Sequence, residues 1–210
     1  MSVRRILAVL STTALMGAAA VAGANGAAAD DDDLGDRSLA KVLAKDGSGF
    51  DRNPWDYDIL DNAVHAVLDA KPDSAVKVLA DGDTALTAFL PNDLAFRRLV
   101  NDLTGTWRGS EKDVFTAAAS VGIDTVEAVL LYHVVPGATI DSRAAKKADG
   151  ASLDTALDGA SFTVDVRDGR IVLVDGDPDD ANARVIAPDI NKGNKQIGHG
   201  ISRVLRPMDL

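Results

Sequence analysis

Three histidines, His65, His133 and His199, are the side chains in this sequence best suited to acid–base chemistry. Imidazole titrates near neutral pH, so it serves as a general base or as a metal ligand. A Ser-His-Asp hydrolase would also need a serine on a sharp strand-to-helix turn with the pattern Gly-x-Ser-x-Gly. The chain lacks that pattern, and Gly47-Ser48-Gly49 has no strand before it. The sequence therefore predicts a non-enzymatic protein without catalytic residues.

His133 stands among apolar neighbours, with Leu131 before it and Val134 and Val135 after it. Buried polar groups are nearly always hydrogen-bonded, so a neutral imidazole bonded to the backbone at a buried helix end accounts for this residue. The alternative is a cleft near Tyr132 and His133 that binds a small ligand or modifies a polysaccharide. The sequence favours the structural role.

Carboxylates recur in Asp175-Gly176-Asp177-Pro178-Asp179-Asp180, where they occupy positions 1, 3 and 5 of a calcium-loop pattern. That pattern requires Gly at position 6 and Glu at position 12, and this chain has Asp180 and Ile186 there. An acidic connection between two strands fits these residues better than a calcium site. We therefore predict no metal ligands and no cofactor, with weak, millimolar calcium association through this loop as the alternative.

A small basic island, Lys192-Gly193-Asn194-Lys195, stands out in an acidic chain. Its lysines suit an acidic glycan or an acidic protein partner. Gly and Asn, however, are the residues that most readily take the positive φ angles of tight turns. The sequence favours a turn with flanking solubilising lysines over a binding patch.

Helical periodicity dominates the first part of the chain. Apolar residues recur at i, i+4 and i+8 over residues 59–70, which predicts a helix that ends before Pro72. Short helices are expected over residues 38–44 and 74–79.

Capping residues mark three further helix starts. Asn92 is a good N-cap because its side-chain oxygen can accept a hydrogen bond from the next turn. Ser110 with Asp113, and Asp124 with Glu127, resemble capping boxes.

Strand patterns follow, most of them in the last third of the chain. Residues 84–90 form the first expected strand, and Phe162 to Val166 alternates between apolar and polar positions. Asp168-Gly169 predicts a two-residue hairpin turn. The other expected strands are residues 171–174, 184–187 and 199–205, the last two separated by a loop over residues 188–196.

This order of elements predicts an α+β fold. Two small sheets are expected to form a sandwich or wedge, with the helices of the N-terminal half packed on it. We expect one domain over residues 57–210, preceded by an acidic, loop-rich segment over residues 30–56 with a short helix.

The first 29 residues have the pattern of an export signal. Arg4 and Arg5 form a basic start, residues 6–22 are mostly apolar, and Ala27-Ala28-Ala29 offers a cleavage site. The apolar run falls short of the ~20 strongly apolar residues that span a bilayer. We expect a signal peptide over residues 1–29, cleavage near Ala29, a secreted chain and no stable membrane anchor.

Charge and cysteine content limit the partners. The 210 residues carry a formal charge of −10, and removal of residues 1–29 deletes two arginines and no acidic residue, which gives −12. Such a surface repels phosphate backbones, so we expect no nucleic acid partner. The chain has no cysteine, so it has neither disulfides nor thiolate metal sites.

Three stretches, residues 87–96, 131–137 and 199–207, together resemble the fasciclin-like (FAS1) domain, an extracellular adhesion and interaction module. The first matches the usual run Thr-Val-Phe-Ala-Pro-Thr-Asp-x-Ala-Phe, the second contains the family's Tyr-His followed by Val-Val-Pro-Gly, and the third matches its closing strand. The family-motif residues are Phe89, Pro91, Asn92, Asp93, Phe96, Tyr132, His133, Pro136, Gly137, His199, Ile201, Val204 and Leu205.

The departures from the family pattern are few. Leu90 and Asn92 replace the usual Ala and Thr, and Asn caps a helix at least as well as Thr. In the closing strand, Ser202 replaces Asp and Gln196 replaces Gly.

The resemblance implies a FAS1-like fold and a secreted, single-domain, non-enzymatic module. Such a module would bind an extracellular protein or polysaccharide through its surface loops. In animal relatives the Tyr-His region is linked to receptor binding, which makes Tyr132 and His133 candidate contacts here as well.

Overall fold

The computed structural model describes residues 34–45, 47 and 49–208. The expected signal peptide over residues 1–29 lies outside these residues. The helices are α1 (Leu39–Leu43), α2 (Asp58–Ala70), the 3-10 helix η2 (Ala75–Ala80), α3 (Asp93–Thr104), α4 (Glu111–Ala119), α5 (Ile123–Tyr132) and α6 (Ser142–Lys147). The strands are β1 (Leu86–Pro91), β2 (Val134–Pro136), β3 (Ser152–Asp154), β4 (Ser161–Arg167), β5 (Arg170–Val174), β6 (Ala183–Ile190) and β7 (Gln196–Ile201).

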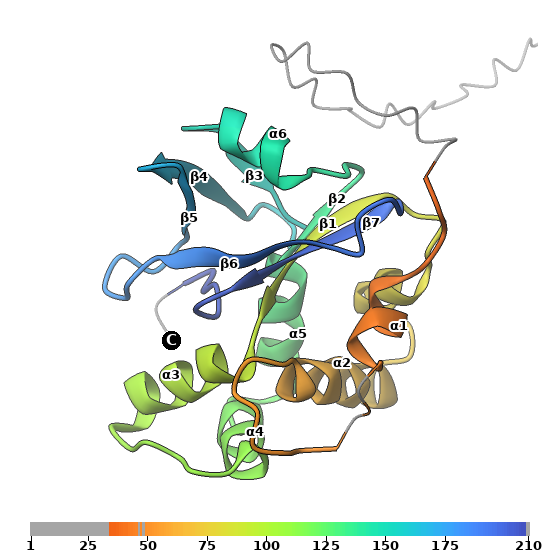
Figure 1. Cartoon of the computed structure of the whole chain (residues 1–210). Coiled ribbons are helices and arrows are strands. Elements are labelled where there is room, and N and C mark those ends of the chain that lie inside the picture. The colour runs from red at the N-terminus through yellow and green to blue at the C-terminus, as the bar shows by residue number, and fades with distance from the viewer. Residues whose placement is uncertain (1–33, 46, 48, 209–210) are drawn as a thin grey trace, which may run out of the picture.

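The strands form one seven-stranded sheet in the order β2-β1-β7-β6-β5-β4-β3. Among these seven strands, β1 and β7 pair in parallel, and the other neighbours pair antiparallel. The expected α+β class is confirmed, but the sandwich of two separate small sheets is not. The apolar strand β5 pairs with β4 on one side and with the start of β6 on the other, so it joins the two halves. The sheet turns sharply between β6 and β5 (Figure 1).

The bent sheet creates two hydrophobic cores on opposite sides of β1. Leu86, Ala88 and Leu90 point into a core shared with α1 to α5. Phe89 points the other way, into a core with Phe162 from β4. Side chains alternate between the two faces of a strand, so every residue of β1 is buried. Figure 1 shows α2 to α5 gathered beyond one end of the strands, while α6 lies near β3.

Several local signals give the elements they predict. Helix α2 spans residues 58–70 and ends before Pro72, as expected. The Asn92 side chain accepts from the Ala95 amide at 3.0 Å, and the Ser110 hydroxyl accepts from the Asp113 amide at 3.2 Å. Both expected caps are therefore confirmed.

The expected cap at Asp124 is wrong. Helix α5 begins at Ile123, directly after Gly122, whose φ of 96° suits glycine. Asp124 lies inside the first turn, and both Asp124 and Glu127 bind the Lys71 ammonium group. The carboxylates therefore join α5 to the end of α2 instead of capping α5.

The last two strands differ from their expected bounds. The sequence predicted a strand that ends at Ala187, but β6 continues to Ile190. Pro188 is tolerated there because it lies within the register shift between Ala187 and Ile190, where the ladder to β7 is irregular. Strand β7 then begins at Gln196 and ends at Ile201, so the intervening loop covers only residues 191–195.

The segment before α2 packs on the same core as the later elements. Leu39 is fully buried, and its amide donates to the Gln196 side chain at 2.8 Å. The Gln196 amide nitrogen in turn donates to the backbone carbonyls of Val78 and Asp81 at 2.8 and 2.7 Å. One buried side chain in the closing strand therefore joins α1, the end of η2 and β7.

Membrane-spanning helices were sought among the described residues. Taken singly, none of these helices has the length and apolar composition needed to cross a bilayer. Helices α4 and α5 meet that requirement only when taken together, and they are bent by 103° at their junction.

We predict that Gln196→Ala destabilises the protein by about 2–4 kcal/mol, because it leaves the buried Leu39 amide and two partly buried carbonyls without their hydrogen-bond partner. Urea unfolding at pH 7 measures this change. Lys147→Ala, at the exposed end of α6, is the control and should change the free energy of unfolding by less than about 0.5 kcal/mol. Equal stability of the two variants would refute the role assigned to Gln196.

Candidate functional site

The first motif stretch forms the switch from β1 to α3. Phe89 contacts Phe162 edge-to-face, with ring centroids 5.2 Å apart. Pro91 ends the strand, Asn92 caps the helix and Phe96 packs into the helical core. All of these side chains are buried. The structure therefore gives them an internal, architectural role.

His133 joins the three motif stretches. Its carbonyl accepts from the Phe89 amide at 2.9 Å. Its ring nitrogen Nε2 accepts from the Leu205 amide at 2.9 Å, and Nδ1 lies 2.6 Å from the carbonyl oxygen of Val129. An amide can only donate, so Nε2 is unprotonated and Nδ1–H donates to Val129. The imidazole is neutral, and both of its nitrogens are hydrogen-bonded to backbone groups. This agrees with the structural role predicted from the sequence.

Tyr132 and His199, the other two motif aromatics with polar atoms, are also hydrogen-bonded to the backbone. The Tyr132 hydroxyl donates to the Ser161 carbonyl at 2.9 Å, and the ring is buried against Phe162. His199 Nδ1 accepts from the Asp189 amide at 3.2 Å, while Nε2 lies 2.8 Å from the Ile140 carbonyl oxygen. These contacts hold both rings in place against the backbone. Both ring nitrogens of His199 are occupied by backbone groups.

The remaining motif residues line the same junctions. Ile201, Val204 and Leu205 are buried, the second in the helical core and the other two in the core of the bent sheet. Pro136 and Gly137 end β2 at the surface, where Gly137 has a φ of 75° and its amide donates to the Ala85 carbonyl. The structure thus places these motif residues at element boundaries or in a core.

A small apolar cavity of about 60 Å³ lies on the helical side of His133. It is lined by apolar residues of α2 to α5, such as Phe96, Phe115 and Val129, and by Val204. This lining supplies neither a nucleophile nor a carboxylate. The arrangement gives no support to polysaccharide chemistry at Tyr132 and His133.

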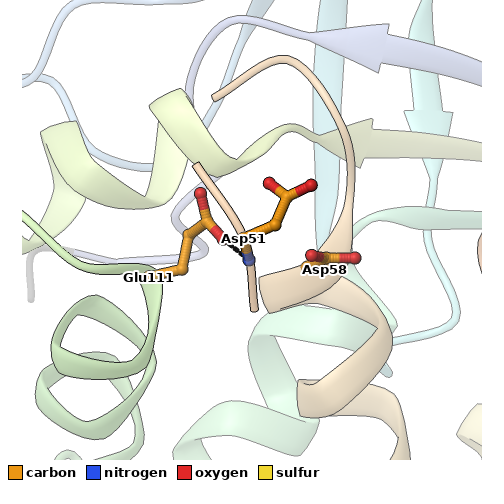
Figure 2. Close-up of side chains that lie close together, drawn as sticks. All are labelled: Asp51, Asp58 and Glu111. Carbon is orange, nitrogen blue, oxygen red and sulfur yellow. Dashed lines mark hydrogen bonds between the residues drawn. The ribbon is translucent and has the colours of Figure 1, made fainter. Parts of the chain in front are cut away.

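Acidic side chains gather where the segment before α2 meets α4. One carboxylate oxygen each from Asp51, Asp58 and Glu111 lies within 4.8 Å of the others (Figure 2). The Asp51 amide also donates to Glu111 Oε2 at 2.6 Å. The sequence analysis did not identify this group, because its members come from three separate segments.

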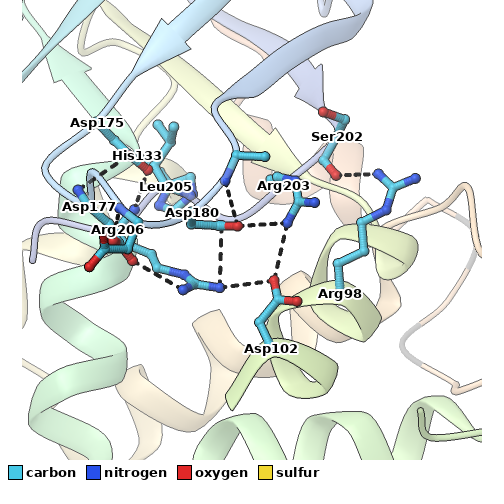
Figure 3. A network of polar contacts seen from close by, with 12 residues as sticks. Arg98, Asp102, His133, Asp175, Asp177, Asp180, Ser202, Arg203, Leu205 and Arg206 are labelled. Carbon is cyan, nitrogen blue, oxygen red and sulfur yellow. Dashed lines mark hydrogen bonds and ion pairs between the residues drawn. The ribbon is translucent and has the colours of Figure 1, made fainter. Parts of the chain in front are cut away.

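The acidic run of residues 175–180 is bound by arginines (Figure 3). Arg206 Nη1 lies 3.1 Å from the buried Asp177 carboxylate, and Nη2 lies 3.3 Å from Asp180. Arg203 lies 2.9 Å from Asp180 as well. The run therefore anchors the end of the chain through ion pairs, which agrees with an acidic connection better than with a calcium loop.

The basic island forms a turn, as the sequence favoured. Asn191 and Gly193 have φ angles of 67° and 87°. Lys192 pairs with Asp189 and Asp141 at 3.0 and 3.3 Å. The turn also binds the N-terminal segment, since the Gly35 amide donates to the Gly193 carbonyl at 2.9 Å. Its lysine charge is thus already partly compensated.

Two exposed tryptophans were missed by the sequence analysis. Trp55 is 63% exposed and Trp107 is 55% exposed. Trp107 lines an open hollow of about 650 Å³ together with Asp51, Arg52 and Ser110. Trp55 lines a second hollow of about 390 Å³ near Lys45. The sequence did contain a usable signal, because neither tryptophan lies in a segment with apolar periodicity. A tryptophan in such a position is expected at the surface and not in a core.

Comparison with known proteins gives two findings. The model of the fasciclin domain family matches residues 61–207. Among solved structures, the chain is similar to a FAS1 domain pair from the insect cell adhesion molecule fasciclin I, with 19% sequence identity and a TM-score of 0.50. This similarity covers 73% of the present chain and 48% of the insect chain, so the present chain spans about half of that length. No curated protein sequence matches.

The burial of His133 predicts a pH dependence. Burial lowers the pKa of His133 to about 4, whereas an unfolded histidine titrates near 6.5. The unfolded chain therefore binds this proton first, and the His133 contribution to stability should fall as the pH drops from about 6.5 to 4. His133→Ala should remove this contribution and cost about 1–3 kcal/mol at pH 7.

Urea unfolding of wild type and His133→Ala across this pH range gives the free energy of unfolding of each protein as a function of pH. The difference between the two proteins is the contribution of His133. His65→Ala removes an exposed imidazole and is the matched control. A difference between wild type and His133→Ala that does not change with pH would contradict the buried neutral ring.

We further predict that Arg206→Met destabilises the protein by about 3 kcal/mol, because it leaves the buried Asp177 carboxylate without its cation. Arg203→Met removes a partly exposed partner of the same network and should cost less than about 1 kcal/mol. Thermal unfolding of both variants measures which arginine contributes more to stability. A smaller loss for Arg206→Met than for Arg203→Met would contradict the assignment.

Proposed function

Because the chain belongs to the fasciclin domain family, we propose that it is a secreted, non-enzymatic interaction module that binds an extracellular protein or polysaccharide. The family is known for adhesion-type domains, which agrees with an interaction role. Secretion is part of the proposal and rests on the export-signal pattern of residues 1–29.

The internal use of the motif side chains supports a non-enzymatic role. Phe89, Tyr132, His133 and His199 are all buried. Both nitrogens of His133 and His199 contact backbone groups. A fold that uses its most distinctive polar residues in this way must recognise partners with other, surface residues.

The observation that carries the proposal is a pair of exposed indoles: Trp55 belongs to the segment 51–57, and Trp107 lines a hollow together with residues of the same segment. Tryptophan is enriched among the residues that dominate binding energy, because it offers a large apolar face and one polar N–H group. The hollow at Trp107 adds charged and hydroxyl groups from Asp51, Arg52 and Ser110. A flat aromatic face with neighbouring polar groups suits a sugar ring or the side chains of a protein partner.

The expected partners follow from charge. The formal charge of the chain is −10, which disfavours nucleic acid and anionic lipid surfaces. A neutral or basic extracellular ligand is therefore favoured. The alternative, a small ligand bound near Tyr132 and His133, has one supporting observation, the apolar cavity beside His133. That cavity would take only a small apolar molecule.

We predict that Trp107→Ala and Trp55→Ala reduce partner capture at least about tenfold, as expected when an anchor worth about 2 kcal/mol is lost. The purified protein is immobilised and exposed to the culture supernatant and cell-wall fraction of its own organism. The melting temperatures of both variants should match wild type, because exposed substitutions rarely alter stability.

Ile186→Ala, at an exposed apolar position of β6, is the matched control and should retain capture. Protease treatment of the fraction abolishes capture if the partner is a protein, and periodate oxidation abolishes it if the partner is a polysaccharide. Unchanged capture by both tryptophan variants would refute this binding surface.

A further inference from the structure

The beginnings of three helices meet at one buried place. Asp58 is the first residue of α2, Asp93 the first of α3 and Glu111 the first of α4. All three are buried. Helix N-termini carry partial positive charge, which stabilises a nearby carboxylate by about 0.3–1 kcal/mol. This contribution explains why acids are tolerated here, but it is small compared with the burial of several charges.

The carboxylates lie at the spacing of metal ligands. One oxygen each from Asp56, Asp58 and Asp93 lies within 4.8 Å of the others, and Asp58 also belongs to the neighbouring set with Asp51 and Glu111 (Figure 2). Two ligands on opposite sides of a Ca²⁺ ion, each about 2.4 Å away, are separated by about this distance. Asp58 is therefore the centre of a five-carboxylate group.

Arg97 forms an ion pair with Glu111, one member of this group. Arg97 Nη2 donates to Glu111 Oε1 at 3.0 Å. Its Nη1 donates to the backbone carbonyls of Arg108 and Gly109 instead. These contacts of Arg97 therefore go to Glu111 and to backbone. Burial of carboxylates is costly, and a bound cation would offset that cost.

Asp93 gives the second, independent sign of a ligand. Its side chain is 0% exposed, and Oδ1 accepts from the Ile59 amide at 3.1 Å. Its other oxygen, Oδ2, is buried and has no hydrogen-bond partner among the described residues. A buried carboxylate oxygen that lacks a donor is the atom a cation would bind.

We propose that Asp56, Asp58 and Asp93 bind one Ca²⁺ ion, with Asp51 and Glu111 beside it. The donors are all carboxylate oxygens, which suit hard cations, and the chain offers no cysteine. Asp51 is exposed and lines the open hollow at Trp107, which Arg97 also lines. Through Asp51, the five-carboxylate group therefore reaches the edge of that hollow.

The test is calcium binding to the purified protein after removal of metals with a chelator. Isothermal titration calorimetry should give one site, and the melting temperature should rise by about 3–6 °C when free Ca²⁺ is about ten times the dissociation constant. Asp93→Asn keeps the acceptor for the Ile59 amide but removes the charge. This variant should fold and bind Ca²⁺ at least about tenfold more weakly than wild type. Its melting temperature should not rise when Ca²⁺ is added.

Asp179→Asn is the matched control, since it removes one exposed carboxylate from the acidic run of residues 175–180. It should retain both the heat of Ca²⁺ binding and the rise in melting temperature. Sodium chloride at matched ionic strength should not reproduce the shift. The proposal is overturned if wild type shows neither binding heat nor a thermal shift up to about 10 mM Ca²⁺, well beyond the weak end for extracellular modules. It is equally overturned if Asp93→Asn responds as wild type does.

Discussion

The parallel pairing of β1 with β7 is the constraint on which the rest of the structure depends. Parallel strands need cover on both faces, and here the helices cover one face while the bent sheet covers the other. Both strands are buried along their whole length. The motif residues follow from this requirement: Phe89 and His199 stand opposite each other in the register, and their rings lie 5.6 Å apart. Around the pair, His133 bonds to the strand β1 and to Leu205 just after β7.

Local signals were sufficient for the parts of the fold that local chemistry determines. Asn92 and Ser110 cap helices because capping needs only the next turn of the same chain. Asp168 and Gly169, with φ angles of 50° and 73°, form the expected hairpin turn. Asp124 failed as a cap because its partner, Lys71, lies 53 positions away in the sequence. A short-range pattern contains no information about such a partner.

The same distinction applies to the candidate site. The motif residues were found through the family resemblance, and the apolar neighbours of His133 indicated its buried, structural role. The sequence could not identify the role of Gln196, which is decided by contacts with Leu39, Val78 and Asp81. Nor could it group Asp58, Asp93 and Glu111, which only the meeting of three helices brings together. The acidic residues that looked most like ligands in sequence, residues 175–180, are instead bound by Arg203 and Arg206.

One feature of the sheet also affects how the molecule is made. Leu86 pairs with Gln196, 110 positions later, so the central pair cannot form until nearly all of the chain is available. Leu205 and Arg206, which bind His133 and the acidic run, come later still. Contacts between such distant segments slow folding and leave unpaired strand edges exposed meanwhile. During synthesis from the N-terminus, β1 would therefore lack its parallel partner until residues 196–201 had been made.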